Sequence, residues 1–174
     1  MKLEPIFESP SVQEIAGRLA RVQEKMKENR LDWYACFQPD NVFYLTHFAN
    51  FVHERPFVLL IPANGTPSFV VPKLEAAHIN SRKVGEIELV EYYEYPAPEG
   101  RAWFDRLKAV LSGSKRVGVE SACTLEIYDA IDAERVRIDI VDDLRLIKTP
   151  YEIGRMVYAA NIASAAMAEL LAEA

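Results

Sequence analysis

Apolar residues recur along the chain at two spacings, one typical of helices and the other of strands. Spacings of three and four residues predict helices over 12–29, 74–82, 102–111 and 124–132. Short apolar runs predict strands at 33–37, 57–61, 68–71, 87–93, 115–120 and 136–141. Because helices and strands alternate, we expect an α/β domain with three layers, in which a mixed β-sheet carries helices on both faces.

Turn and capping residues sharpen this pattern at three points. Ser11 and Glu14 match the capping box that starts a helix. Asp40 or Asn41 can cap a short helical turn that runs through Leu45. Asn64 and Gly65 suit a tight hairpin turn, so the strands at 57–61 and 68–71 should be antiparallel neighbours.

The last segment differs from the rest. Thr149 and Pro150 are suited to starting a helix, and Gly154 is its only breaker as far as Ala174. Bulky apolar residues lie on more than one side of this helix, which predicts a partner that is missing or exchanged. The alternative is a terminal helix tolerated because alanine forms helices well. We therefore divide the chain into a domain at 1–145 and a helical extension at 146–174.

Composition narrows the function classes. The 174 residues carry a net charge of -6, which argues against nucleic acid as a partner. No apolar run approaches the ~20 residues of a spanning helix, so we expect no membrane partner. The N-terminus lacks the apolar core of a signal peptide. Cys36 and Cys123 are too few for a disulfide framework, and buried inert thiols in a cytoplasmic protein are expected.

The known catalytic motifs are incomplete or missing. His53 and Glu54 begin like a zinc-binding helix motif, but Phe57 stands where the second histidine is needed. Asp142 and Asp143 follow a predicted strand, where neighbouring side chains point to opposite faces, so we interpret them as solvated loop charges. There is neither a glycine-rich phosphate loop nor a nucleophile elbow. The sequence thus contains no self-contained catalytic site.

One segment does have functional character. Residues 50–56 concentrate aromatic, imidazole and guanidinium groups just before the strongest predicted strand. Arg55 there could bind a carboxylate or a peptide end through a bidentate fork, with His53 beside it. The alternative is that Arg55 pairs with a local acid such as Glu54 or Asp40, while His53 is merely exposed.

Several segments together resemble the creatinase and prolidase N-terminal domains. Residues 41–46 read N-V-F-Y-L-T and, with Phe48, resemble the family segment N-x-x-Y-L-T-G-F. Residues 54–62 resemble the strand that follows it. Residues 144–153 resemble the linker L-R-x-I-K-(S/T)-x-x-E-I, which leads into the first helix of the catalytic domain. One departure is His47, where the family usually has glycine, and it leaves the backbone geometry of that turn open.

The resemblance implies a fold and a function. The fold is an RNase H-like α/β domain, and residues 146–174 are the linker and first helix of an otherwise absent catalytic domain. Relatives cleave Xaa-Pro bonds as aminopeptidases or dipeptidases, or are creatinases, and the resemblance does not choose among these. In the peptidases, two Asp, one His and two Glu hold two divalent metal ions (manganese, cobalt or zinc) that activate water. Those ligands lie beyond the linker, so we expect this chain to contribute no catalytic residue and no metal site.

The resemblance also implies partners. These are the chain's own C-terminal catalytic domain and a second subunit, because the N-terminal domain of relatives shares in the dimer contact and places a loop over the neighbouring active site. By resemblance, the 50–55 segment is that loop, with His53 and Arg55 on the substrate side. Two alternatives stay open: a free-standing small-molecule or peptide binding domain without a catalytic half, and a hydrolase that uses Asp142 and Asp143.

Overall fold

The computed structural model describes residues 4–50 and 55–173, which form two units. Residues 11–144 make up one unit, which contains the β-sheet. The described residues before Ser11 join the residues from Arg145 onward in a second unit, built around one long helix. The sequence did not predict that the start of the chain groups with its end.

The sheet unit is built on six strands in the order β4-β3-β2-β1-β5-β6. β1 runs parallel to β5 and antiparallel to β2, so the sheet is mixed, as expected. Gly65 has a φ of 100° in the turn between β2 and β3, which are antiparallel neighbours as predicted. The strands are β1 (Trp33–Cys36), β2 (Val58–Pro62), β3 (Ser68–Pro72), β4 (Glu88–Tyr92), β5 (Arg116–Val119) and β6 (Glu134–Arg137).

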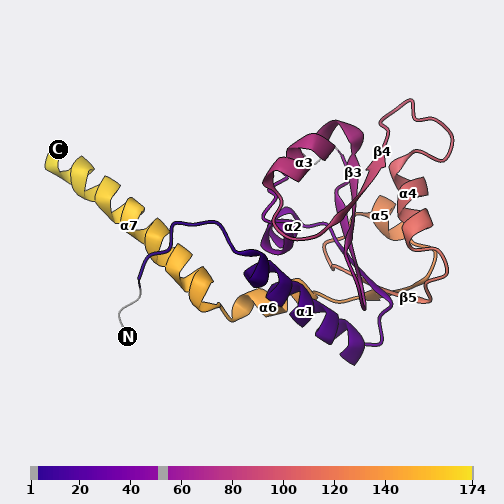
Figure 1. Ribbon diagram of the computed structural model, residues 1–174, viewed down its shortest axis with the longest axis horizontal. Helices are drawn as coiled ribbons and strands as arrows, with labels where there is room; N and C mark the ends of the chain where they lie inside the picture. The colour runs from indigo at the N-terminus through magenta and orange to yellow at the C-terminus, as the bar shows by residue number, and fades with distance from the viewer. Residues whose placement is uncertain (1–3, 51–54, 174) are drawn as a thin grey trace. The chain divides into compact units, whose positions relative to one another are not determined.

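Helices cover both faces of this sheet, which confirms the three-layer expectation (Figure 1). On one face, α1, α2, α3 and α6 pack on a cluster that includes Val22, Leu45 and Ile79. On the other face, Leu107 and Ile127 bring α4 and α5 onto a second cluster. The helices of this unit are α1 (Val12–Glu28), α2 (Pro39–Thr46), the short 3-10 helix η1 (Lys73–Glu75), α3 (Ala76–Arg82), α4 (Trp103–Val110), α5 (Leu125–Ala130) and α6 (Ile140–Leu146).

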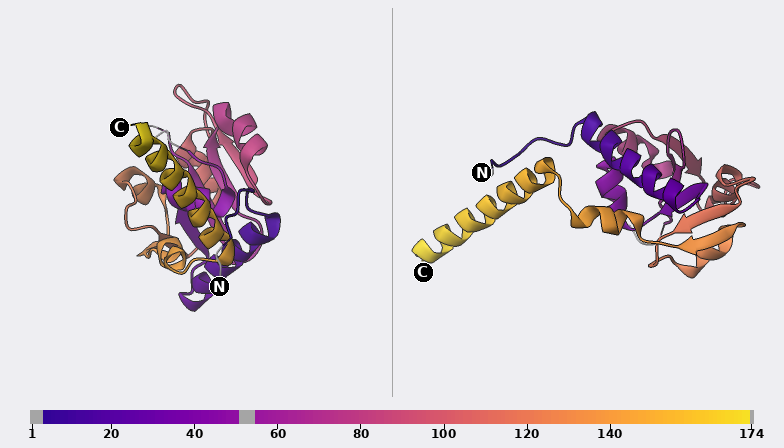
Figure 2. Two further views of the ribbon diagram at one scale, coloured as in Figure 1. Left: turned by 90° about the vertical axis from the view of Figure 1, so that its left-hand side faces the viewer. Right: turned by 90° about the horizontal axis from the view of Figure 1, so that it is seen from below.

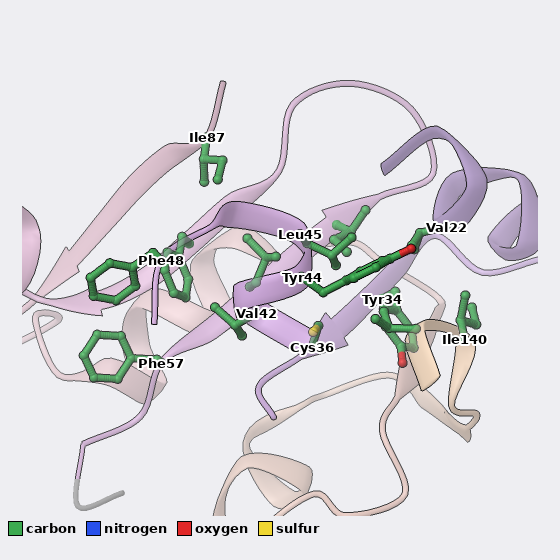
Figure 3. Packing of buried hydrophobic residues seen from close by; sticks show 14 of the residues in the cluster. Val22, Tyr34, Cys36, Val42, Tyr44, Leu45, Phe48, Phe57, Ile87 and Ile140 are labelled. Atoms are coloured by element: carbon green, nitrogen blue, oxygen red, sulfur yellow. The ribbon is translucent and has the colours of Figure 1, made fainter. Parts of the chain in front are cut away.

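The first of these cores contains an aromatic group beside the start of β2. Phe48, which follows α2, lies near Phe57, with ring centroids 6.2 Å apart (Figure 3). Phe69 of β3 completes the group at 6.3 Å from Phe48. Tyr34 of β1 and Ile140 at the start of α6 belong to the same core cluster (Figure 3). The two ends of the segment that joins α2 to β2 are therefore anchored in the core.

The predicted strand at 136–141 is wrong in its second half. β6 ends at Arg137, and α6 begins at Ile140. Alternation of apolar and polar residues favoured a strand there, but Ile140, Val141 and Leu144 also fit one face of a helix, and all three pack in the first core cluster. Burial on that face therefore outweighs the local alternation.

Capping residues mark the helix ends in part. The predicted cap at Asp40 or Asn41 is wrong: α2 begins earlier, at Pro39, and its N-cap is Gln38, which makes no side-chain capping hydrogen bond. The Ser11 hydroxyl accepts the Glu14 N–H at 3.1 Å, as predicted for the start of α1. The C-cap of α2 is His47, which has a φ of 57° in the left-handed region. Glycine adopts this conformation most easily, which explains physically why a glycine suits this position in relatives. His47 keeps the same kind of turn with a side chain present.

The second unit is dominated by α7 (Pro150–Glu173), a continuous helix (Figure 2). Its predicted start is confirmed: the Thr149 hydroxyl accepts the Glu152 N–H at 3.2 Å, and the Glu152 carboxylate accepts the Thr149 N–H at 2.7 Å. Among the described helices, none combines the length and the apolar character needed to cross a membrane. The exposed bulky residues of α7 are Met156, Ile162, Met167, Leu170 and Leu171.

We predict that Gly17→Ala stabilises the sheet unit. Gly17 lies within α1, and a Cβ built there meets no atom within 4 Å. Alanine is more favourable than glycine in a helix interior by about 1 kcal/mol, so the free energy of unfolding should rise by about that amount. Urea unfolding of the purified chain measures it, and a loss of stability would contradict the packing described for α1.

Candidate functional site

Strand directions bring several chain segments to one edge of the sheet. β1 and β5 are parallel, β3 and β4 are parallel, and β2 runs opposite to both β1 and β3. The carboxyl ends of β1, β3, β4 and β5 therefore share an edge with the beginning of β2. We call this the carboxyl edge. In open α/β sheets, ligand sites lie outside the carboxyl ends of the strands.

A buried carboxylate, Glu120, lies at the carboxyl edge directly after β5. It is fully buried. One oxygen, Oε2, accepts the backbone N–H groups of Phe37 and Gln38, each at 2.9 Å. These two N–H groups belong to the turn between β1 and α2, so Glu120 fixes that turn against the end of β5. A buried carboxylate needs such donors, because its own hydration is lost.

Asn41 extends this network to a third element. Its Nδ2 donates to Glu120 Oε1 at 2.8 Å and to Asp142 Oδ2 at 3.1 Å. Asp142 lies in the first turn of α6. The sequence interpretation of Asp142 and Asp143 as loop charges is therefore wrong: they lie in a helix, and Asp142 is hydrogen-bonded to a buried side chain. Glu120, Asn41 and Asp142 together join the ends of β1 and β5 to α2 and α6.

Burial raises the pKa of Glu120 above its usual value. The Phe37 and Gln38 N–H groups and the Asn41 amide act in the opposite direction, because they stabilise the ionised form. The charged carboxylate accepts all of these hydrogen bonds, whereas its protonated form would have fewer acceptor sites to offer. The protonation state of the Glu120 carboxyl therefore affects the turn between β1 and α2.

Arg55 lies at the same edge, just before β2. Its Nε contacts a carboxylate oxygen of Glu94, which follows β4. About a third of each side chain is exposed, so this ion pair adds at most about 1 kcal/mol to stability. The alternative expected a local acid, Glu54 or Asp40, as the partner. Among the described residues the partner is Glu94, which lies beyond the end of β4 and is distant in sequence. Glu54 and the predicted site residue His53 lie outside the described residues.

Two adjoining hollows surround Arg55. One is about 330 Å³ and is lined by Tyr92, Glu94, Trp103 and Glu126, among others. The other is about 230 Å³ and reaches Asn50. Both are lined by a shared set of residues: Arg55, Pro56, Thr124 and Ile127.

One residue in the lining of each hollow carries a buried polar atom without a hydrogen-bond partner in the part of the chain that the structure describes. These atoms are the Tyr92 hydroxyl and Asn50 Oδ1. Burial raises the pKa of Tyr92, so its hydroxyl stays protonated and is able to donate. A buried polar group without a partner costs roughly 1–3 kcal/mol. The hollows thus combine a half-buried guanidinium with apolar walls, and the buried polar groups of Tyr92 and Asn50 belong to residues of their lining, which suits a small polar molecule or a chain end.

Metal and nucleophile chemistry receives no support from the described residues. Among them, no three His, Cys, Asp or Glu side chains lie close enough together to hold a metal ion. Cys36 is buried and Cys123 is half-buried, and burial raises the pKa of Cys123 to about 11. The described residues therefore do not fit the pair of metal ions that the resemblance implies for relatives.

Sequence reasoning missed Glu120, Glu94 and the two unpartnered groups. A signal for Glu120 was present, because a single acid directly follows a short apolar strand. Glu94 gave no comparable signal, since its contact with Arg55 depends on the strand order. Of the predicted site residues, the structure places Arg55 at a hollow.

We predict that Glu120→Gln destabilises the fold by about 2 kcal/mol, because an amide leaves a buried donor without an acceptor. The loss should depend on pH. With its pKa raised in the folded state, Glu120 adds most stability below its unfolded pKa and progressively less as pH rises through the folded pKa. Glutamine does not titrate, so the gap between wild type and variant should narrow as pH rises.

Urea unfolding at about pH 5 and pH 8 measures this gap. Glu126→Gln is the matched control, because Glu126 is exposed on α5. We expect the control to change stability little at either pH. A gap for Glu120→Gln that widens with pH would contradict the direction of its pKa shift.

A known protein family and known proteins match most of this chain. The family model described as the creatinase/prolidase N-terminal domain matches residues 18–148. An uncharacterized peptidase of Staphylococcus epidermidis is 26% identical over 150 residues, which cover 84% of this chain and 41% of that protein. The chain thus spans less than half the length of this curated relative.

Solved structures share the fold. A Xaa-Pro dipeptidase from Bacillus anthracis superposes with a TM-score of 0.75 at 24% identity, over 92% of this chain and 44% of that one. A Creatine_N superfamily domain of a dipeptidase from Streptococcus thermophilus does so with a TM-score of 0.62 at 20% identity, over 80% of this chain and 100% of that one. Together with the family match over most of its length, these similarities establish that the chain belongs to the creatinase/prolidase N-terminal domain family.

Proposed function

We propose that this chain is the non-catalytic N-terminal domain of a metal-dependent Xaa-Pro peptidase of the prolidase or aminopeptidase P type. The observation that carries the proposal is the family match over residues 18–148. The similarity to a Xaa-Pro dipeptidase of more than twice its length supports it. In this proposal the peptidase works in the cytoplasm, and residues 146–174 lead into its catalytic domain.

The two metal ions belong to that catalytic domain in the proposal. Manganese, cobalt or zinc would be held by carboxylate and imidazole ligands outside this chain. In this proposal the N-terminal domain takes no part in activating water. Its contribution is to cover the substrate and to share in a dimer contact.

Arg55 is the residue that we propose to contact substrate in a neighbouring subunit. A guanidinium pairs with a carboxylate through parallel N–H groups. The contact with Glu94 uses Arg55 Nε, and a third of the side chain remains exposed for a ligand. Glu94 thus holds the guanidinium in place through a weak ion pair. His53 belongs to the same proposed loop.

The second candidate function is a free-standing domain that binds a small molecule or a peptide. The two unpartnered groups beside Arg55, Tyr92 Oη and Asn50 Oδ1, favour it, because a bound ligand could satisfy both. In that case the protein would have no catalytic half. The same hollow would then be the whole functional site, and not one side of a shared site.

We predict that the coding sequence continues past Ala174 into a region that encodes two Asp, one His and two Glu as metal ligands. Sequencing of the genomic locus checks this. A stop codon directly after Ala174 would contradict the peptidase proposal and favour the binding domain.

In the full-length protein, Arg55→Ala should lower kcat/KM for Xaa-Pro substrates by about 10- to 100-fold. A charge-assisted hydrogen bond contributes roughly 1.5–3 kcal/mol, and its loss should appear mainly in KM. Steady-state kinetics with a dipeptide series measures the effect. Arg82→Ala is the control, because Arg82 is exposed on α3, away from the hollows. Equal kinetics for both variants would contradict the proposal that Arg55 contacts substrate.

A further inference from the structure

The start of the chain lies against α7 at its one glycine. The Ile6 N–H donates to the Gly154 carbonyl at 3.0 Å. Gly154 is buried, although most of α7 is exposed. A Cβ at position 154 would lie 2.5 Å and 2.6 Å from the side-chain carbons Cγ1 and Cδ1 of Ile6, and 3.1 Å from the Glu4 carbonyl oxygen. The glycine therefore makes room for this segment, which explains a helix breaker inside α7.

Further contacts hold the same segment along one face of the helix. The Tyr151 hydroxyl donates to the Glu8 carbonyl at 2.9 Å. The Arg155 guanidinium donates to the carbonyls of Ile6 and Phe7. The Phe7 ring meets Tyr158 edge-on, with centroids 5.4 Å apart. The contacting helix positions are 151, 154, 155 and 158, which share one helix face. Figure 1 shows the segment crossing α7.

We infer that this face of α7 is a docking site for an extended peptide segment, and that residues 4–8 of the same chain occupy it as an intramolecular clasp. The chemistry of the site specifies its ligand. Gly154 admits a branched aliphatic side chain, and Tyr158 takes an aromatic ring. Tyr151 and Arg155 donate hydrogen bonds to the backbone carbonyls of three successive residues. The Ile6-Phe7 pair meets these requirements. The inference is independent of the proposed peptidase function.

The clasp has a consequence for how the two units are connected. The chain passes from one unit to the other between Pro10 and Ser11, and again between Leu144 and Arg145. With residues 4–8 docked, the α7 unit is tied to the sheet unit by two chain connections. Without docking, only the connection at Leu144 would tie α7 to the sheet unit.

Gly154→Ala in the full chain separates docking from helix stability. Alanine favours helix over glycine, so the α7 amides should keep or gain protection from hydrogen exchange. The new Cβ collides with Ile6, so the Ile6 amide should exchange about tenfold faster or more. Gly17→Ala makes the same change in α1, where no atom lies within 4 Å of the new Cβ, and should leave Ile6 unaffected. Unchanged Ile6 protection in Gly154→Ala would overturn the inference.

A second variant tests the fit of the two side chains. Ile6→Ala removes the carbon atoms that the new Cβ would meet, so the double variant Ile6→Ala, Gly154→Ala should regain part of the protection at position 6. Purely additive losses would contradict a direct fit. Light scattering shows whether the same chain or a second copy occupies the site. We expect Gly154→Ala to leave the molar mass of the protein in solution the same as that of the wild type. A dimer that Gly154→Ala dissociates would place the segment of a second copy in the site and overturn the intramolecular clasp.

Discussion

The buried carboxylate of Glu120 is the constraint on which the carboxyl edge depends. A charge without water must find donors inside the protein, and Glu120 finds them in the turn after β1 and in Asn41. Through Asn41 the network reaches α6 at Asp142. One side chain thus sets the position of two strand ends and two helices. Loss of any donor would leave a charge buried with incomplete hydrogen bonding, which is costly.

This arrangement determines where function can lie. Gln38 and Phe37, which Glu120 holds, also line the smaller hollow beside Arg55. The segment from α2 to β2 is anchored at its two ends by Phe48 and Phe57 in the aromatic core. Arg55 therefore projects from a supported edge of the sheet. The guanidinium and the two buried polar atoms are thus held at an edge whose neighbouring turns are fixed by hydrogen bonds and core packing.

The sequence predicted most of the fold because local signals and burial agree there. Asn64 and Gly65 correctly predicted the hairpin, and Thr149 correctly predicted the start of α7. The prediction failed at 138–141, where alternation and helical spacing both fit the same residues and only the packing of Ile140 and Val141 against the core decides. Boundaries of this kind depend on tertiary contacts, which a single sequence does not display.

The site was harder to predict than the fold for a physical reason. Arg55 stood out as a candidate because of its residue type, but its partner Glu94 lies close to it only through the strand order. Glu120 and Asn41 are 79 positions apart, and their contact depends on the parallel pairing of β1 with β5. The contact of Gly154 with Ile6 joins the two ends of the chain. Long-range pairs of this kind leave no spacing pattern in the sequence.

We propose that this chain contributes binding surface and no catalysis of its own. The most direct measurement is a Xaa-Pro hydrolysis assay of the rigorously purified chain, with and without added manganese or cobalt. We predict no hydrolysis above the buffer background under either condition. Hydrolysis that co-purifies with the chain and responds to the metal would contradict it.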